Sequence, residues 1–314
     1  MKVIDREEVR SRLTYEVCIP LVRQAMIAFS RGETRQLLRS IIPLADGRMF
    51  GIMPGALGER GLFGAKLISV FPDNFAKGIQ SHQGVVVLFD GQSGAPLCLA
   101  HAGEITAIRT AAASAVATDV LARPGADRMA ILGYGEQAAT HLRAISQVRR
   151  LRGVAIWGRN PDRAAVFASA MARETGIEVV ASDSAEMAVE GADIVCTVTS
   201  ASEPILFGRW LAPGTHVNLV GSSFAGPAEA DIELVAGSRF IADSREGVLA
   251  QGAEFLRAKA AGRVDDSHVV GEIGQVLDGT LQGRQSDEQI TVYKSLGHVV
   301  QDLAAAGALY EGAA

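Results

Sequence analysis

The sequence predicts an α/β protein in which a doubly wound parallel sheet is inserted into an α+β domain. From residue 128 to residue 242, short apolar stretches alternate with helical patterns, as they do in parallel sheets. Before residue 120, turn residues separate short extended stretches, a pattern typical of an antiparallel sheet. A glycine-rich turn also joins the first apolar stretch of the alternating part to a helical pattern.

The first part of the chain opens with a helical region, because apolar residues recur at helical spacing between Asp5 and Phe29. A helix rich in small residues is expected at 104–121, ahead of Pro124 and Gly125. Between these helices we expect five extended stretches, at 39–44, 49–53, 64–70, 84–89 and 96–100.

The second part alternates strands with helices. The predicted strands lie near 128–133, 153–157, 177–180, 193–198, 215–220 and 238–242. An apolar, alanine-rich helix from about Gly297 is expected to pack back on the first part. We therefore predict a substrate-binding and dimerisation domain at 1–120 plus 298–314, and a nucleotide-binding domain at 121–297.

Composition is that of an ordinary globular protein, with 48% hydrophobic and 21% charged residues among 314. The net charge of −5 and the scattered Lys and Arg residues indicate neither a nucleic-acid nor a membrane partner. The start of the chain is charged, and Cys18, Cys98 and Cys196 lack metal-ligand or redox spacing. We expect a cytoplasmic protein without a metal site.

The glycine turn carries the first functional signal. Gly133 permits a tight turn, Gly135 lets the backbone approach a phosphate, and Ala138 lets the helix pack close to the strand. The helix N-terminus then offers N–H groups to a pyrophosphate. This pattern favours a Rossmann-type dinucleotide site, although a glycine-rich turn in another α/β protein remains the alternative.

The end of the second strand indicates which dinucleotide. An NAD-selective site usually has Asp or Glu there, to accept a hydrogen bond from the ribose 2′-hydroxyl. Here Gly158 is followed by Arg159, whose guanidinium suits a 2′-phosphate. The sequence therefore favours NADPH, with NADH possible.

Three cations in the first part indicate an anionic substrate. Arg39 opens an extended stretch, Lys66 lies within an apolar one, and Arg109 lies on the small-residue helix. Arg and Lys are seldom buried without a partner, and a carboxylate is a natural one. The alternative is a set of ordinary ion pairs, such as Arg109 with Glu104. His82 is either structural or a donor to substrate or nicotinamide.

Several segments resemble the ornithine cyclodeaminase/μ-crystallin family over nearly the whole chain. They include Gly64-Ala-Lys66, Ser81-His-Gln-Gly84, Glu104-Ile-Thr-Ala-Ile-Arg109, Ile131-Leu-Gly-Tyr-Gly135 and Gly283-Arg-Gln-Ser-Asp287. The resemblance implies a homodimer joined through the first domain. It also implies that Arg39, Lys66 and Arg109 hold the carboxylate of the substrate.

Two departures separate this chain from the cyclodeaminases of that family, which carry acidic residues at the corresponding positions. Here those positions are Gly51 and Ser223. Without these carboxylates a diamine lacks an anchor for its distal ammonium and a base. The pattern is therefore more similar to the imine-reducing branch of the family.

We thus expect NAD(P)H-dependent reduction of Δ1-pyrroline-2-carboxylate to L-proline, and of Δ1-piperideine-2-carboxylate to pipecolate. The alternatives are ornithine cyclodeaminase, an alanine dehydrogenase-like enzyme and a non-catalytic μ-crystallin-like binding protein. Catalysis is assigned to Lys66, Ser223 and His82, with a water held by Ser223 or His82 as one source of the proton. Substrate binding is assigned to Arg39, Lys66, Arg109 and Met53. Cofactor binding is assigned to Ser81, Gly133, Tyr134, Gly135, Glu136, Gln137, Arg159, Asn160, Thr197, Val198, Thr199, Val220 and Gly221.

Overall fold

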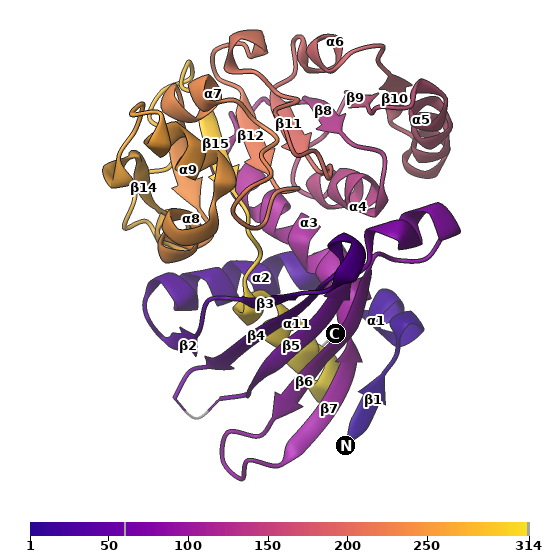
Figure 1. Ribbon diagram of the computed structural model, residues 1–314, viewed down its shortest axis with the longest axis vertical. Coiled ribbons are helices and arrows are strands. Elements are labelled where there is room, and N and C mark those ends of the chain that lie inside the picture. The colour runs from indigo at the N-terminus through magenta and orange to yellow at the C-terminus, as the bar shows by residue number, and fades with distance from the viewer. Residues whose placement is uncertain (60, 313–314) are drawn as a thin grey trace. The chain divides into compact units, whose positions relative to one another are not determined.

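A computed structural model describes residues 1–59 and 61–312 of the chain (Figure 1). Residues 313 and 314, which belong to the predicted first domain, lie outside the described part. The chain divides into two compact units, Met1–Thr110 with His298–Ala314 and Ala111–Gly297. The division falls inside helix α3 (Ala102–Leu121), earlier than the expected boundary at residue 120.

The first unit is built on a mainly antiparallel sheet in the order β1-β7-β6-β5-β4-β2, with β3 also paired to β4. Each predicted stretch is confirmed as a strand, and the short β1 and β2 were not expected. β1 runs parallel to β7, whereas the other pairs are antiparallel. The strands are β1 (Lys2–Ile4), β2 (Thr34–Gln36), β3 (Ser40–Pro43), β4 (Met49–Leu57), β5 (Phe63–Val70), β6 (His82–Phe89) and β7 (Pro96–His101).

The helical region expected from Asp5 to Phe29 consists of two helices, α1 (Arg6–Arg12) and α2 (Tyr15–Ser30). The helical conformation is interrupted at Leu13 and Thr14, because Thr14 adopts an extended conformation. The apolar pattern continues across the break because Leu13 is itself buried. Helix α11 (Val299–Glu311), yellow in Figure 1, packs against α2 and the sheet strands β4, β5 and β6.

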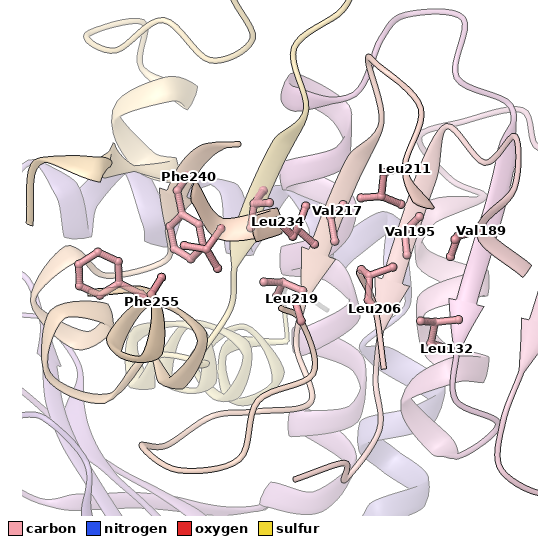
Figure 2. Packing of buried hydrophobic residues seen from close by; sticks show 14 of the residues in the cluster. Leu132, Val189, Val195, Leu206, Leu211, Val217, Leu219, Leu234, Phe240 and Phe255 are labelled. Carbon is pink, nitrogen blue, oxygen red and sulfur yellow. The ribbon is translucent and has the colours of Figure 1, made fainter. Parts of the chain in front are cut away.

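The second unit is a parallel sheet in the order β10-β9-β8-β11-β12-β15-β13-β14. Its strands β11 and β12 are buried along their whole length, as expected where helices cover both faces. Figure 2 shows Leu132, Val195, Val217 and Leu219 of this core. The strands are β8 (Arg128–Leu132), β9 (Gly153–Trp157), β10 (Glu178–Ala181), β11 (Ile194–Thr197), β12 (His216–Leu219), β13 (Arg239–Ala242), β14 (Val269–Glu272) and β15 (Thr291–Lys294).

The six predicted strands of this unit are confirmed within one residue at either end. Strands β14 and β15 were not expected, and β15 lies between β12 and β13. Strand β15 was not predicted because it ends at Lys294, and a lysine is rarely found in a buried strand. Here the Lys294 ammonium is 2.7 Å from the Glu254 carboxylate, and both side chains are fully buried. The helices are α4 (Glu136–Ile145), α5 (Pro161–Thr175), α6 (Ala185–Val189), α7 (Ile232–Ala236), α8 (Arg245–Gln251), α9 (Ala253–Ala260) and α10 (Ile273–Leu277).

The strand order places a topological switch point between β8 and β11. From β8 the sheet extends one way through β9 and β10, and the other way through β11 and β12. In such sheets ligands bind where the carboxyl ends of the two central strands part. Within the described residues, the structure has no helix long and apolar enough to cross a membrane.

Candidate functional site

The glycine turn lies at this switch point, directly after β8. Gly133 has a φ of 135°, and a Cβ atom there would lie 2.9 Å from Cγ2 of Val198, which follows β11. The position therefore requires glycine for both conformation and space. Gly135 precedes α4 and provides no side-chain cap, so the first N–H groups of α4 remain suited to an anion. Tyr134, Glu136 and Gln137 occupy the same turn.

Glu229 organises the loops that follow β11 and β12, a role that the sequence did not indicate. Its carboxylate accepts hydrogen bonds from the N–H of Thr199 (2.6 Å) and from the N–H of Gly221 (2.7 Å). It also accepts from the hydroxyl groups of Thr197 and Thr199, both at 2.7 Å. One buried carboxylate thus fixes the segments predicted to bind the cofactor, including Val198 and Val220. The sequence feature that could have indicated this role is the position of Glu229 between two alanines, which suggests a buried acid.

The buried pair of Lys294 and Glu254 supports the same loops. Glu254 accepts a hydrogen bond from the backbone N–H of Glu229 at 3.1 Å. Lys294 donates to the carbonyl oxygen of Ser222 at 2.6 Å. Ser222 is the neighbour of Ser223, which lies half-buried in the loop after β12. The structure therefore holds the segment of Ser223 in place from inside the core.

The end of β9 has no room for the acidic residue of an NAD-selective site. A Cβ atom on Gly158 would lie 2.1 Å from Cδ1 of Tyr134, so the tyrosine ring occupies the space of a side chain. Arg159 is exposed, and Asn160 caps α5 by accepting a hydrogen bond from the N–H of Arg163. The Arg163 guanidinium lies over the Tyr134 ring, 5.5 Å from its centroid. This end of the site is cationic and aromatic.

The first unit brings together the cations that were expected to bind a carboxylate. Lys66 on β5 lies directly across from Met53 on β4, and both are buried. Arg109 comes from α3, and both cations contact the carboxylate of Asp302 on α11. The Lys66 ammonium is 2.8 Å from Oδ2, and the Arg109 Nε is 3.0 Å from Oδ1. Lys66 and Arg109 are each 3% exposed and Asp302 is fully buried.

The ion pair of Arg109 with Glu104 that we considered is wrong. Glu104 binds Arg6 and Arg10 instead, at 3.0 and 2.9 Å. Residues five positions apart point to different sides of a helix, whereas partners three or four apart meet. Arg109 does have an acidic partner, but Asp302 is 193 positions away and no local pattern indicated it.

Burial and mutual repulsion perturb the ionisable groups of this cluster. Loss of hydration and the neighbouring Arg109 lower the pKa of Lys66 to about 7, although Asp302 opposes the shift. His82 is exposed, and partial loss of hydration together with the charges of Lys66, Arg109 and Arg39 lowers its pKa. His82 is therefore neutral at pH 7 and is not a proton donor of the imidazolium type. Its Nδ1 lies 2.9 Å from the hydroxyl of Ser81.

His298 is a further member of the cluster that sequence reasoning missed. It precedes α11, and its ring lies tilted against that of Phe29, with centroids 4.3 Å apart. Its Nδ1 is buried without a hydrogen-bond partner. Burial lowers its pKa to about 4, and the charge of Arg39 contributes. The histidine is thus a neutral group beside the cations.

Comparison with known proteins identifies the chain. The model of the ornithine cyclodeaminase/mu-crystallin family matches residues 1–314. The chain belongs to this family. It is 36% identical to the ketimine reductase mu-crystallin of Mus musculus, over 98% of this chain and 96% of the relative.

Solved structures of the ornithine cyclodeaminase/mu-crystallin type have the same fold. The structure of Thermococcus litoralis Δ1-pyrroline-2-carboxylate reductase in complex with NADH and L-proline has a TM-score of 0.96 and 34% identity. The match covers 100% of this chain and 97% of that one. An archaeal alanine dehydrogenase dimer with bound NAD has a TM-score of 0.92 and 27% identity, over 99% and 95% of the two chains. This chain is accordingly a nicotinamide-dependent oxidoreductase of the family.

The two positions that we expected to differ from cyclodeaminases, 51 and 223, carry no acidic group. Gly51 is on β4, two residues from Met53 and hence on the same face of the sheet. A Cβ atom there would lie 3.4 Å from the side chain of Ile68, so only small adjustments would admit a larger residue. Ser223 offers a hydroxyl group rather than a carboxylate.

Proposed function

We propose that this protein is an NAD(P)H-dependent reductase of small cyclic imino acids that converts Δ1-pyrroline-2-carboxylate to L-proline. The buried cluster of Lys66, Arg109 and Asp302 carries the proposal. The cations of this cluster outnumber the one carboxylate of Asp302, so the cluster carries positive charge that suits a substrate carboxylate. The neutral Gly51 and Ser223 offer no counter-charge for the second ammonium of a diamine.

We assign the two units different tasks. The unit with the cation cluster, 1–120 plus 298–314, binds the imino acid, and the parallel-sheet domain, 121–297, binds NAD(P)H. We also propose a homodimer joined through the first unit. Apolar residues are exposed there, with Leu37 at 72% and Ile42 at 52%, and the archaeal alanine dehydrogenase relative is a dimer.

The residues of the glycine turn fit a dinucleotide. Gly133 leaves space where a Cβ would collide with Val198, and the uncapped start of α4 provides N–H groups for the pyrophosphate. Gly135, Glu136 and the loops fixed by Glu229 would hold the rest of the cofactor. Arg159 would bind the 2′-phosphate and give NADPH its advantage over NADH.

When bound, a reduced nicotinamide would supply the hydride that the imine carbon receives. Arg39, Lys66 and Arg109 hold the carboxylate, so that orientation accounts for much of the rate. The imine nitrogen gains a proton in the same overall reaction. Lys66 is the member of the cluster whose pKa of about 7 suits proton exchange near neutrality. A water held by Ser223 or by His82 is the other proposed source of this proton.

The carboxylate cluster recognises the group that five- and six-membered imino acids share. We therefore extend the proposal to Δ1-piperideine-2-carboxylate, which would give pipecolate. We also place the enzyme in the cytoplasm, a compartment that suits its buried, unpaired cysteines.

The decisive assay measures NADPH oxidation with each cyclic imine, alongside ammonia release from L-ornithine. We expect rapid imine reduction and no ammonia, because burying the distal ammonium without a counter-charge costs several kcal/mol. The proline formed should match the NADPH consumed. Steady ammonia release at a rate similar to imine reduction would show that another acid performs the role of the residues missing at 51 and 223.

A further inference from the structure

Asp302 does more than neutralise a buried charge, because its two oxygens serve two cations. Oδ1 accepts from Nε of Arg109 at 3.0 Å, and Oδ2 lies 2.8 Å from the Lys66 ammonium. The neighbouring Gln301 accepts from Nη1 of Arg109 at 2.9 Å. Consecutive residues of α11 thus fix the direction of a guanidinium that comes from α3.

The charges around Lys66 show what Asp302 contributes. Arg109 and Arg39 disfavour the ammonium, as does the loss of hydration, and Asp302 favours it. The other titratable groups beside these charges are neutral at pH 7, because the pKa values of His82 and His298 are lowered and that of the buried Cys18 thiol is raised. Asp302 is therefore the anion that opposes discharge of Lys66.

We propose that Asp302 is a positioning residue, which aims Arg109 and keeps Lys66 charged so that the pair can bind one substrate carboxylate. This inference rests on the proposed function, because it specifies how that site recognises its substrate. Without Asp302, two buried cations would face each other, and the amine that can lose a proton would do so. The pocket would then lose a positive charge in the neutral pH range.

The test compares Asp302→Asn with the unmodified enzyme across pH. In the unmodified enzyme, kcat/KM for the imine should fall as the pH rises through the pKa of Lys66, since the neutral amine binds a carboxylate poorly. In Asp302→Asn this limb should move to lower pH by about one unit. At pH 7.5 the KM should rise about tenfold, with a smaller change in kcat. Calorimetric titration with L-proline should show the same shift.

Glu104→Gln is the matched control. Glu104 lies in the same unit, is 5% exposed and also binds two arginines, but it does not contact Lys66 or Arg109. Loss of the Glu104 charge should affect the stability of the protein and leave the pH at which kcat/KM falls unchanged. An unchanged limb in Asp302→Asn, or an equal shift in Glu104→Gln, would overturn the proposal.

Asp302→Glu decides the matter if the asparagine variant does not fold. This variant keeps the negative charge but changes the direction in which Arg109 is held. The pH at which kcat/KM falls should therefore stay the same while KM rises. A fall in kcat/KM at lower pH would overturn the inference. Failure of the unmodified enzyme to reduce either imine would count against the proposed function instead. In that event, the affinity for L-proline is measured across the same pH series in the unmodified protein and in Asp302→Asn. If the pH dependence of this affinity is the same in both proteins, the role of Asp302 is refuted.

Discussion

At the end of β9, the ring of Tyr134 occupies the space beside residue 158, where the ribose of the cofactor is expected to bind. Tyr134 covers Gly158 so closely that a side chain at position 158 would collide with it. With the ring in this place, residue 158 contributes no side chain at the end of β9. Arg159 follows immediately and is exposed, where a 2′-phosphate can reach it.

We predict that Arg159→Asp shifts the preference from NADPH toward NADH. Loss of one charge-assisted contact should weaken NADPH binding by about 1.5–3 kcal/mol, or roughly 10- to 150-fold. Fluorescence titration with both cofactors measures this directly. Arg173→Asp, an equal charge change on an exposed residue of the same helix region, should leave the ratio unchanged. Equal affinities for both cofactors before and after the Arg159 change would refute the assignment.

The candidate site residues that the sequence indicates are those whose charge is unusual for their neighbours in the chain. Lys66 and Arg109 could be found because a cation among apolar or small residues needs a partner. Asp302 could not, since it lies in an alanine-rich helix and its partners are distant in sequence. Glu229 was similarly concealed, because its four hydrogen bonds connect loops that only the sheet brings together.

At the scale of elements, the link from β8 to α4 depends on a close approach between two loops. Gly133 approaches Val198 with no space for a methyl group, and its positive φ is unfavourable for other residues. The conformation of the turn between β8 and α4 therefore depends on its close packing against the residue that follows β11.

Gly133→Ala should accordingly weaken cofactor binding more than it disturbs the sheet. Strain and collision together should cost about 1–3 kcal/mol, shared between stability and affinity. Calorimetry with NADPH and urea unfolding separate the two effects. Gly125→Ala is the control, because a Cβ atom there meets nothing within 4 Å. Equal NADPH affinities for the two variants would contradict the role given to Gly133.

Elements were predictable where their periodicity was regular and local. The alternation after residue 128 gave correct strands because each one is short, apolar and bounded by turns. The break between α1 and α2 was missed because the buried Leu13 continues the helical pattern. Strand β15 was missed because the partner that neutralises Lys294 lies at residue 254.

At the scale of the whole molecule, buried neutral histidines make the fold sensitive to acid. In its neutral form, His141 donates from Nδ1 to the Gln137 carbonyl oxygen and accepts at Nε2 from the Ser114 hydroxyl. Burial lowers its pKa to about 4 and that of His216 to about 3. The unfolded chain binds protons at these residues from about pH 6.5 downward. The stability that they contribute is thus present above pH 6.5 and is lost as the pH falls toward 4.

We expect the free energy of unfolding to decrease between pH 7 and pH 5 by about 2 kcal/mol for each such histidine. His141→Gln should reduce this dependence, whatever its effect on stability at pH 7. Urea unfolding of both proteins at several pH values tests this. Parallel curves of stability against pH for the two proteins would exclude His141 as a contributor.

The distance along the chain between Asp302 and its partners also has a consequence for biosynthesis. Lys66 and Arg109 are translated well before Asp302, which is 193 residues beyond Arg109. Until α11 is made, a nascent first unit contains two cations without their counter-charge and a sheet face without its helix. Such an intermediate exposes apolar strands and is a natural substrate for chaperones. The cluster of Lys66, Arg109 and Asp302 is therefore completed only at a late step of folding, when α11 docks on the sheet.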